Sequence, residues 1–100
     1  MVTRYDISGI GYKGSLNLSR RSRLDIYFDV LELIGNGTDI PARIIYETNL
    51  SWEVGSNVFD TLIRSGFIWE KKEKESVRYN LTTKGRNVLS YYWKALENLV

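Results

Sequence analysis

The first part of the chain repeats one pattern, in which apolar residues at helical spacing are interrupted by short polar breaks. In segments 20–35 and 52–65 the apolar residues recur every three or four positions, which predicts an amphipathic helix in each. A shorter apolar pattern follows Pro41 and predicts a helix of about two turns, because proline suits the first turn of a helix. Glycine and asparagine at 35–37 and the sequence NLS at 49–51 are typical of helix ends and caps. The pattern therefore predicts three successive helices, the last two joined by a tight turn.

The period changes from helical to alternating after Gly66. Residues 77–81 alternate between apolar and polar positions, which predicts a strand with one buried face. The aromatic, apolar run at 67–70 predicts a partner strand, and the charged residues 71–76 predict an exposed turn between the two. A further, very short strand is predicted at residues 38–40. The sequence thus adds a β-hairpin to the three helices.

A last helix is expected over residues 84–100, with Thr82 or Thr83 as its cap. Its apolar residues span about 200° of the helix circumference. One small domain cannot easily cover so broad an apolar face, so part of it is expected to contact a second chain. We therefore divide the chain into an N-terminal arm at 1–19, a helix-and-hairpin domain at 20–83 and the C-terminal helix.

The residue composition argues against an enzyme or a metalloprotein. One hundred residues make one domain, and the chain has no cysteine and no histidine. Disulfides and thiolate metal sites are thereby excluded, and the usual proton shuttle and commonest metal ligand are missing. The glycines of the sequence GIGYKG at 9–14 mimic a dinucleotide-binding motif but lack the strand before it and the helix after it. No cofactor and no catalysis are expected.

The net charge of +2 is unevenly distributed, with the basic excess at the two ends and in the hairpin. Such a distribution permits a nucleic-acid partner without requiring one. The chain has no apolar run long enough for a membrane helix, and the charged Arg4 and Asp6 do not fit a signal peptide. The expectation is a cytoplasmic protein. Its first 19 residues are either a loose arm or an arm that touches DNA through Arg4 and Lys13.

The order of the elements and two sequence steps resemble those of winged helix-turn-helix transcriptional regulators. The steps are L-x-x-x-G followed by two apolar residues at 62–68, and Y-x-L-T-x-K-G at 79–85. The stretches RSRLDIYFDVLELIGNG and RIIYETNLS, followed by a long closing helix, are similar to those of small dimeric archaeal winged-helix proteins of about ten kilodaltons. The resemblance implies an α+β, mainly α, fold with a three-helix core, a β-hairpin wing and a long C-terminal dimerisation helix.

The resemblance also implies residue roles, with the third helix in the major groove of DNA, the hairpin on a neighbouring groove or the backbone, and the last helix paired with its twin. In the third helix it points to Trp52, Glu53, Ser56, Asn57, Asp60 and Arg64, and in the hairpin to Lys71, Lys72, Lys74 and Arg78. The residues themselves add basic candidates for backbone contacts at Arg20, Arg21, Arg23 and Arg43. The expected dimer interface comprises Leu89, Tyr92, Trp93, Leu96 and Leu99.

The acidic residues of the third helix keep a second hypothesis open. Glu53 and Asp60 outnumber Arg64 there, and two carboxylates facing phosphates would weaken DNA binding. The lysines at 71–74 alternate with glutamates and could form a turn that neutralises itself. We expect a dimeric DNA-binding regulator or chromatin-like protein that other transcription or chromatin proteins could join. The alternative is a winged-helix module that binds another protein without contacting DNA.

Overall fold

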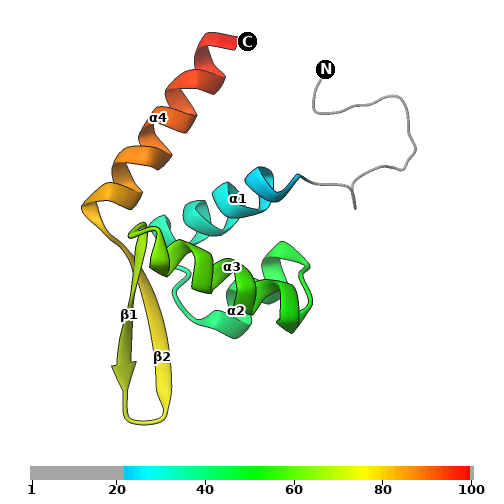
Figure 1. Cartoon of the computed structure of the whole chain (residues 1–100), viewed down its shortest axis with the longest axis vertical. Helices are drawn as coiled ribbons and strands as arrows, with labels where there is room; N and C mark the ends of the chain where they lie inside the picture. The colour runs from blue at the N-terminus through cyan, green and yellow to red at the C-terminus, as the bar shows by residue number, and fades with distance from the viewer. Residues whose placement is uncertain (1–21, 100) are drawn as a thin grey trace.

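The computed structural model describes residues 22–99 (Figure 1). Within this range the elements follow one another as α1 (Arg23–Gly35), α2 (Pro41–Thr48), α3 (Trp52–Arg64), β1 (Ile68–Glu73), β2 (Ser76–Leu81) and α4 (Thr83–Leu99). The predicted order of three helices, a hairpin and a last helix is confirmed. The predicted arm at 1–19 and the predicted contacts Arg20 and Arg21 lie outside the described residues.

Side-chain caps fix where the helices begin. The Ser22 hydroxyl accepts a hydrogen bond from the Asp25 N–H at 3.0 Å, and the Asp25 carboxylate accepts one from the Ser22 N–H at 3.2 Å. Ser51 caps α3 in a simpler way, because its hydroxyl accepts from the Val54 N–H at 3.1 Å. These bonds satisfy N–H groups that have no partner inside a helix. Because each of these bonds joins residues only three positions apart, the start of a helix can be predicted from the sequence.

The turn between α2 and α3 is tight because two residues permit it. Asn49 adopts the left-handed conformation, with φ of 58°, at the C-terminal end of α2. Gly55 lies against α2 so closely that a Cβ atom there would come within 2.6 Å of the Ile45 side chain. Because Gly55 has no side chain, the two helices can approach, and the position of α2 determines how α3 is presented.

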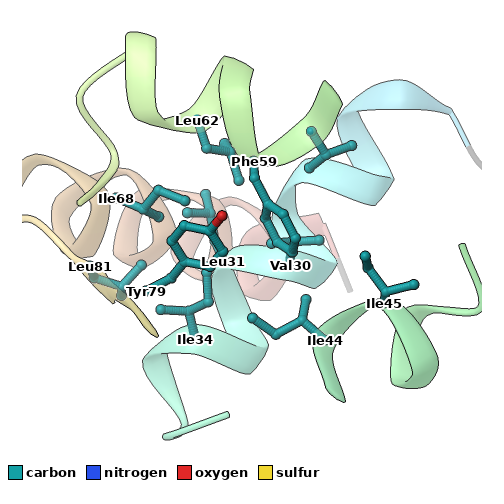
Figure 2. Packing of buried hydrophobic residues seen from close by; sticks show 11 residues of the cluster. Val30, Leu31, Ile34, Ile44, Ile45, Phe59, Leu62, Ile68, Tyr79 and Leu81 are labelled. Carbon is teal, nitrogen blue, oxygen red and sulfur yellow. The ribbon is translucent and has the colours of Figure 1, made fainter. Parts of the chain in front are cut away.

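The core lies where α1, α2, α3 and the hairpin formed by β1 and β2 meet (Figure 2). It contains the buried side chains of Val30, Leu31, Ile34, Ile44, Ile45, Val58, Phe59, Leu62, Ile68, Tyr79 and Leu81. Leu24 belongs to the apolar face predicted for α1, yet 60% of it is exposed, and Val54 of α3 is 40% exposed. Both residues lie near the first turn of their helices, and burial concentrates further along each helix.

The strands pair in antiparallel register from Ile68 opposite Leu81 to Glu73 opposite Ser76. Burial falls along β1, where Ile68 is buried and the next five residues are exposed. The predicted strand at 38–40 is wrong, because the structure has no strand there. A single backbone hydrogen bond, from the Tyr79 N–H to the Asp39 carbonyl at 2.9 Å, joins this loop to β2. This hydrogen bond holds the loop against β2, but it does not make residues 38–40 a third strand of the sheet.

Helix α4 leaves the domain after its first turns. Gly85 is buried, and the Tyr92 ring stacks on Phe28 of α1 with ring centroids 3.9 Å apart. Beyond this stack the helix continues into water, and Leu99 is 82% exposed. Figure 1 shows the tip of the hairpin and the C-terminal end of α4 at opposite ends of the molecule. The hairpin and α4 therefore project from the core toward opposite ends of the molecule.

Candidate nucleic-acid interface

Helix α3 presents one continuous polar face to solvent. The burial of Gly55, Val58, Phe59 and Leu62 determines which side of the helix faces the core. The residues predicted to contact the major groove all lie on the exposed part of the helix: Trp52, Glu53, Ser56, Asn57, Asp60 and Arg64. Trp52 is 61% exposed, so its side chain is largely accessible and does not cover the edge of the core. The structure thus brings the predicted set together.

The arginines of α2 and α3 are paired with carboxylates on their own helices. Arg64 lies 3.4 Å from Asp60, measured from Nη1 to Oδ2, and both side chains are about two-thirds exposed or more. Arg43 donates from Nε to the Glu47 carboxylate one turn further along α2. Exposed pairs of this kind contribute little to stability in water. Each arginine can therefore exchange its carboxylate for another anion at a low cost in free energy. Glu53 adds a further negative charge to the exposed face of α3.

The hairpin holds some of its cations in ion pairs and leaves others available. Glu73 lies between two of them, 3.4 Å from the Lys71 ammonium and 3.6 Å from the Arg78 guanidinium. Arg78 also donates to both carboxylate oxygens of Asp39, at 3.2 and 3.3 Å, and so ties β2 to the loop before α2. Over residues 22–99, no ion pair involves Lys72 or Lys74, and both are exposed.

Two further available cations lie on α4, where the sequence reasoning assigned no DNA contact. Arg86 and Lys94 are exposed, and neither forms an ion pair within the described part of the chain. Arg23, at the start of α1, is likewise exposed and unpaired in that range. The signal in the sequence is that α4 has no acidic residue before Glu97. The available positive charge thus lies on the hairpin, on α4 and at the start of α1, and not on α3.

The predicted dimer residues form a stripe along α4, and only part of that stripe is accessible. Leu89 and Tyr92 are half-buried against the domain, and Tyr92 stacks on Phe28. Leu96 is half-buried, whereas Trp93 is 42% and Leu99 82% exposed. Leu89, Tyr92, Leu96 and Leu99 are spaced three, four and three residues apart, which is the spacing of a coiled-coil seam, and Trp93 lies beside that seam. The domain occupies the inner half of this seam, and its outer half is open.

The comparison with known families supports this architecture. A family model described as "Winged helix-turn-helix" matches residues 20–99. The chain belongs to the winged helix-turn-helix family. Its fold is α+β, mainly α, with the hairpin as the wing and a long C-terminal helix. The resemblance drawn from the sequence is thereby confirmed at the level of family and fold.

Relatives of this winged-helix chain occur in archaea. The uncharacterized protein MJ0287 of Methanocaldococcus jannaschii is 36% identical over 78 residues, which cover 78% of this chain and 76% of that protein. The crystal structure of Sso10a-2, a DNA-binding protein from Sulfolobus solfataricus, is similar with a TM-score of 0.61 and 28% identity, covering 79% of this chain and 85% of that one.

The fold also matches a bacterial protein solved with DNA. FabT of Streptococcus pneumoniae in complex with DNA has a TM-score of 0.65 and 20% identity, covering 80% of this winged-helix chain and 62% of that chain. At this identity the likeness concerns the fold alone.

Within residues 22–99, no group of acidic side chains is arranged to hold a metal ion, and no helix is both long and apolar enough to cross a membrane.

Tyr79 fastens the hairpin to α3. Its ring packs on Phe59, with centroids 4.5 Å apart, and only 7% of the residue is exposed (Figure 2). Burial raises the pKa of Tyr79 above its usual value of 10.0, and the negative charges of Glu70 and Asp60 raise it further. The neutral phenol is therefore the form that the folded protein favours.

This raised pKa predicts a loss of stability in alkaline solution. The contribution of Tyr79 is complete below about pH 10 and declines as the pH rises above that value, because unfolding then releases the Tyr79 proton more easily. The Tyr79→Phe variant should lose less unfolding free energy than the wild type between about pH 9 and 11, as measured by urea denaturation. Tyr91→Phe, at a 70% exposed position of α4, is the control and should follow the wild type. Identical pH profiles for the wild type and Tyr79→Phe would contradict the prediction.

Proposed function

We propose that this protein is a homodimeric DNA-binding protein, a regulator of transcription or a chromatin-like binder of the cytoplasmic nucleoid, and not an enzyme. Helix α3 enters the major groove and the hairpin contacts the backbone. The observation that carries the proposal is the exposed polar face of α3, which the core aims outward beside a hairpin with available lysines. Similarity to Sso10a-2, which is a DNA-binding protein, supports the same partner.

The side chains on α3 have the chemistry to read base edges. The Asn57 amide can form two hydrogen bonds with adenine, and Arg64 can form two with guanine once Asp60 releases it. Ser56 can donate or accept, and the Glu53 carboxylate can accept from the amino group of cytosine. Trp52, at the first turn of α3, is placed to pack on a sugar or a thymine methyl group. An acidic helix can therefore select bases while other elements provide the attraction to phosphate.

Phosphate contacts are assigned to the basic side chains that the sequence predicts as backbone contacts, because neutralised phosphates account for most of the sequence-independent affinity. The set comprises Arg20, Arg21, Arg23, Arg43, Lys71, Lys72, Lys74 and Arg78. Arg23, Lys72 and Lys74 are the strongest candidates among the described residues, since none of them has a carboxylate to release there. Arg78 is the weakest, because Asp39 and Glu73 both hold it.

The dimer follows from the apolar residues that α4 exposes beyond the domain. A monomer would leave Trp93, Leu99 and the outer side of Leu96 in water, on a helix whose seam has coiled-coil spacing. An antiparallel twin helix would cover these residues, while Leu89 and Tyr92 would contribute the surface that α1 leaves open. Dimerisation would also double the number of cations that face one duplex.

Salt dependence should identify the lysines that contact DNA. Affinity for a generic duplex, measured by fluorescence anisotropy at several salt concentrations, should fall steeply as salt rises. The double variant Lys72→Gln/Lys74→Gln should lower the slope of log affinity against log salt by about one unit per lysine. The control Arg86→Gln/Lys94→Gln removes the same charge from α4 and should keep the wild-type slope. A flat wild-type response would exclude this electrostatic mode of binding.

The acidic face of α3 favours a second candidate function, a module that binds another protein. Tyr46 on α2 and Trp52 on α3 are 81% and 61% exposed, and α3 also carries Glu53 and Asp60. Aromatic side chains with acidic neighbours suit a basic protein surface, such as that of another transcription or chromatin protein.

Neutralising the acids discriminates between these two functions. If α3 faces phosphates, Glu53→Gln/Asp60→Asn should strengthen duplex binding, by about tenfold at low salt, because two repulsive charges are removed. The control Glu32→Gln/Glu97→Gln makes the same change in net charge on α1 and α4. Equal effects of the two variants would indicate net charge alone, and no effect of either would favour a protein partner on α3.

The size of the particle in solution tests the dimer. Light scattering should report twice the 11.6 kDa mass of the chain for the wild type. Leu96→Asp/Leu99→Asp should yield a monomer, because charges in the seam cannot be buried without partners. The control Asn87→Asp/Asn98→Asp places the same charges on the polar side of α4 and should remain dimeric. A monomeric wild type, or a dimeric leucine variant, would rule out this interface.

A further inference from the structure

The C-terminal end of α3 and the N-terminal end of α4 meet directly, although the whole hairpin separates them in the chain. Three successive carbonyl groups after α3 each accept a hydrogen bond from the start of α4. The Lys84 ammonium donates to Ser65 at 2.8 Å, the Thr82 hydroxyl to Gly66 at 2.6 Å, and the Thr82 N–H to Phe67 at 3.0 Å. We call the contacts of residues 65–67 with Thr82, Lys84 and Gly85 the α3–α4 latch.

Thr82 and Lys84 each contribute to the junction between the end of α3 and the start of α4. The Thr82 hydroxyl that donates to Gly66 also accepts from the Gly85 N–H at 2.9 Å, which makes Thr82 the cap of α4. The Lys84 ammonium meets a carbonyl at the negative end of the α3 dipole and lies 5.1 Å from the centroid of the Phe67 ring. One hydroxyl and one ammonium thus join two helix ends.

Gly85 makes this approach possible. A Cβ atom at Gly85 would lie 2.0 Å from the Phe67 carbonyl oxygen, so any side chain would force α4 away from the segment that ends α3. The T-x-K-G step of the sequence therefore has a physical role at each of its three fixed positions. Thr82 and Lys84 donate the hydrogen bonds, and Gly85 permits the distance.

Beyond the latch, α4 is held by Val88 and Leu89, which pack against the core, and by the stack of Tyr92 on Phe28. The later part of the helix extends into water, where Leu99 is 82% exposed. A 17-residue helix is about 25 Å long, so a tilt of about 10° at the latch would move its far end by about 4 Å. In a dimer joined through the outer half of α4, such an error would occur in both copies.

We propose that the latch positions the two DNA-reading helices of the dimer. Thr82, Lys84 and Gly85 fix the angle between α3 and α4, and that angle sets the distance between the two copies of α3. Two reading helices can engage one duplex together only when their separation matches whole turns of DNA, about 34–36 Å or a multiple. The inference rests on the proposed function, because it requires DNA binding by a dimer paired through α4.

The test compares a loosened latch with a matched control. Thr82→Val/Lys84→Met removes the hydroxyl and the ammonium and keeps most of the side-chain volume. The control Thr83→Val/Lys94→Met makes the same two substitutions at exposed positions of α4 that are outside the latch. The conservative variant Thr82→Ser/Lys84→Arg retains both donors and should restore wild-type behaviour.

Two duplexes of generic sequence separate positioning from contact. A duplex of about 12 base pairs accommodates one reading helix, and one of about 30 base pairs accommodates two. The wild type should bind the long duplex at least about 100-fold more tightly, since the second contact is intramolecular. The loosened latch should bind the short duplex within about twofold of the wild type and lose about tenfold or more of the gain on the long one. Misfolding would instead weaken binding to both.

A distance measurement tests the latch without DNA. Because the chain has no cysteine, spin labels can be placed on α3 and at the end of α4 through Ser56→Cys and Asn98→Cys. In samples diluted with unlabelled protein, the distance distribution between the labels should be narrow for the wild type and the control, and broader for the loosened latch. An equally narrow distribution for the loosened latch would overturn the inference.

The outcomes separate this inference from the proposed function. If the wild type binds neither duplex, the proposed function is wrong and the positioning role falls with it. If the wild type gains affinity on the long duplex and the loosened latch gains as much, DNA binding stands and only the positioning role is overturned. A lost gain together with a broadened distance distribution supports both.

Discussion

The burial of one side of α3 is the constraint on which the rest of the structure depends. Val58, Phe59 and Leu62 lie in the core between α1, α2 and the hairpin. Because a helix has a fixed turn of about 100° per residue, burying these residues leaves Ser56, Asn57 and Asp60 facing solvent. The close approach of α2 at Gly55 and the packing of Tyr79 on Phe59 keep α3 at this rotation. The candidate interface is thus a by-product of core packing.

The distribution of charge explains how an acidic helix can serve a DNA-binding protein. Arginines on the helix-turn-helix face are held by neighbouring carboxylates, whereas Lys72 and Lys74 on the hairpin have no such partner among the described residues. Attraction to phosphate and discrimination between bases would then reside on different elements. Carboxylates on a helix that faces DNA would weaken the sequence-independent attraction to phosphate, which supplies essentially all of non-specific binding and only a share of specific binding. The ratio of specific to non-specific affinity could therefore be high even where the affinity itself is modest.

Helix α4 serves two purposes along one stripe. Its inner half completes the domain through Tyr92 and Phe28, and its outer half exposes Leu99, which a second copy would cover in the proposed dimer. The same helix begins at the latch, where Thr82 and Lys84 bind the end of α3. Any change in how α4 leaves the domain would therefore affect the outer half and α3 together. In the proposed dimer, this continuity would link the interface between the two copies to the exposed face of α3.

The sequence by itself determined the elements, their order and their caps, because apolar spacing and capping act over a few neighbouring residues. It placed Ser56 and Asn57 on the polar side of α3 for the same reason. It could not show that Arg78 pairs with Asp39, 39 residues away, or that Lys84 binds the Ser65 carbonyl, 19 residues away. It also predicted a strand at 38–40, where the structure has a loop, and it assigned no DNA contact to Arg86 or Lys94. Those outcomes belong to the tertiary structure, because partners distant in the chain meet only after the helices and the hairpin have packed.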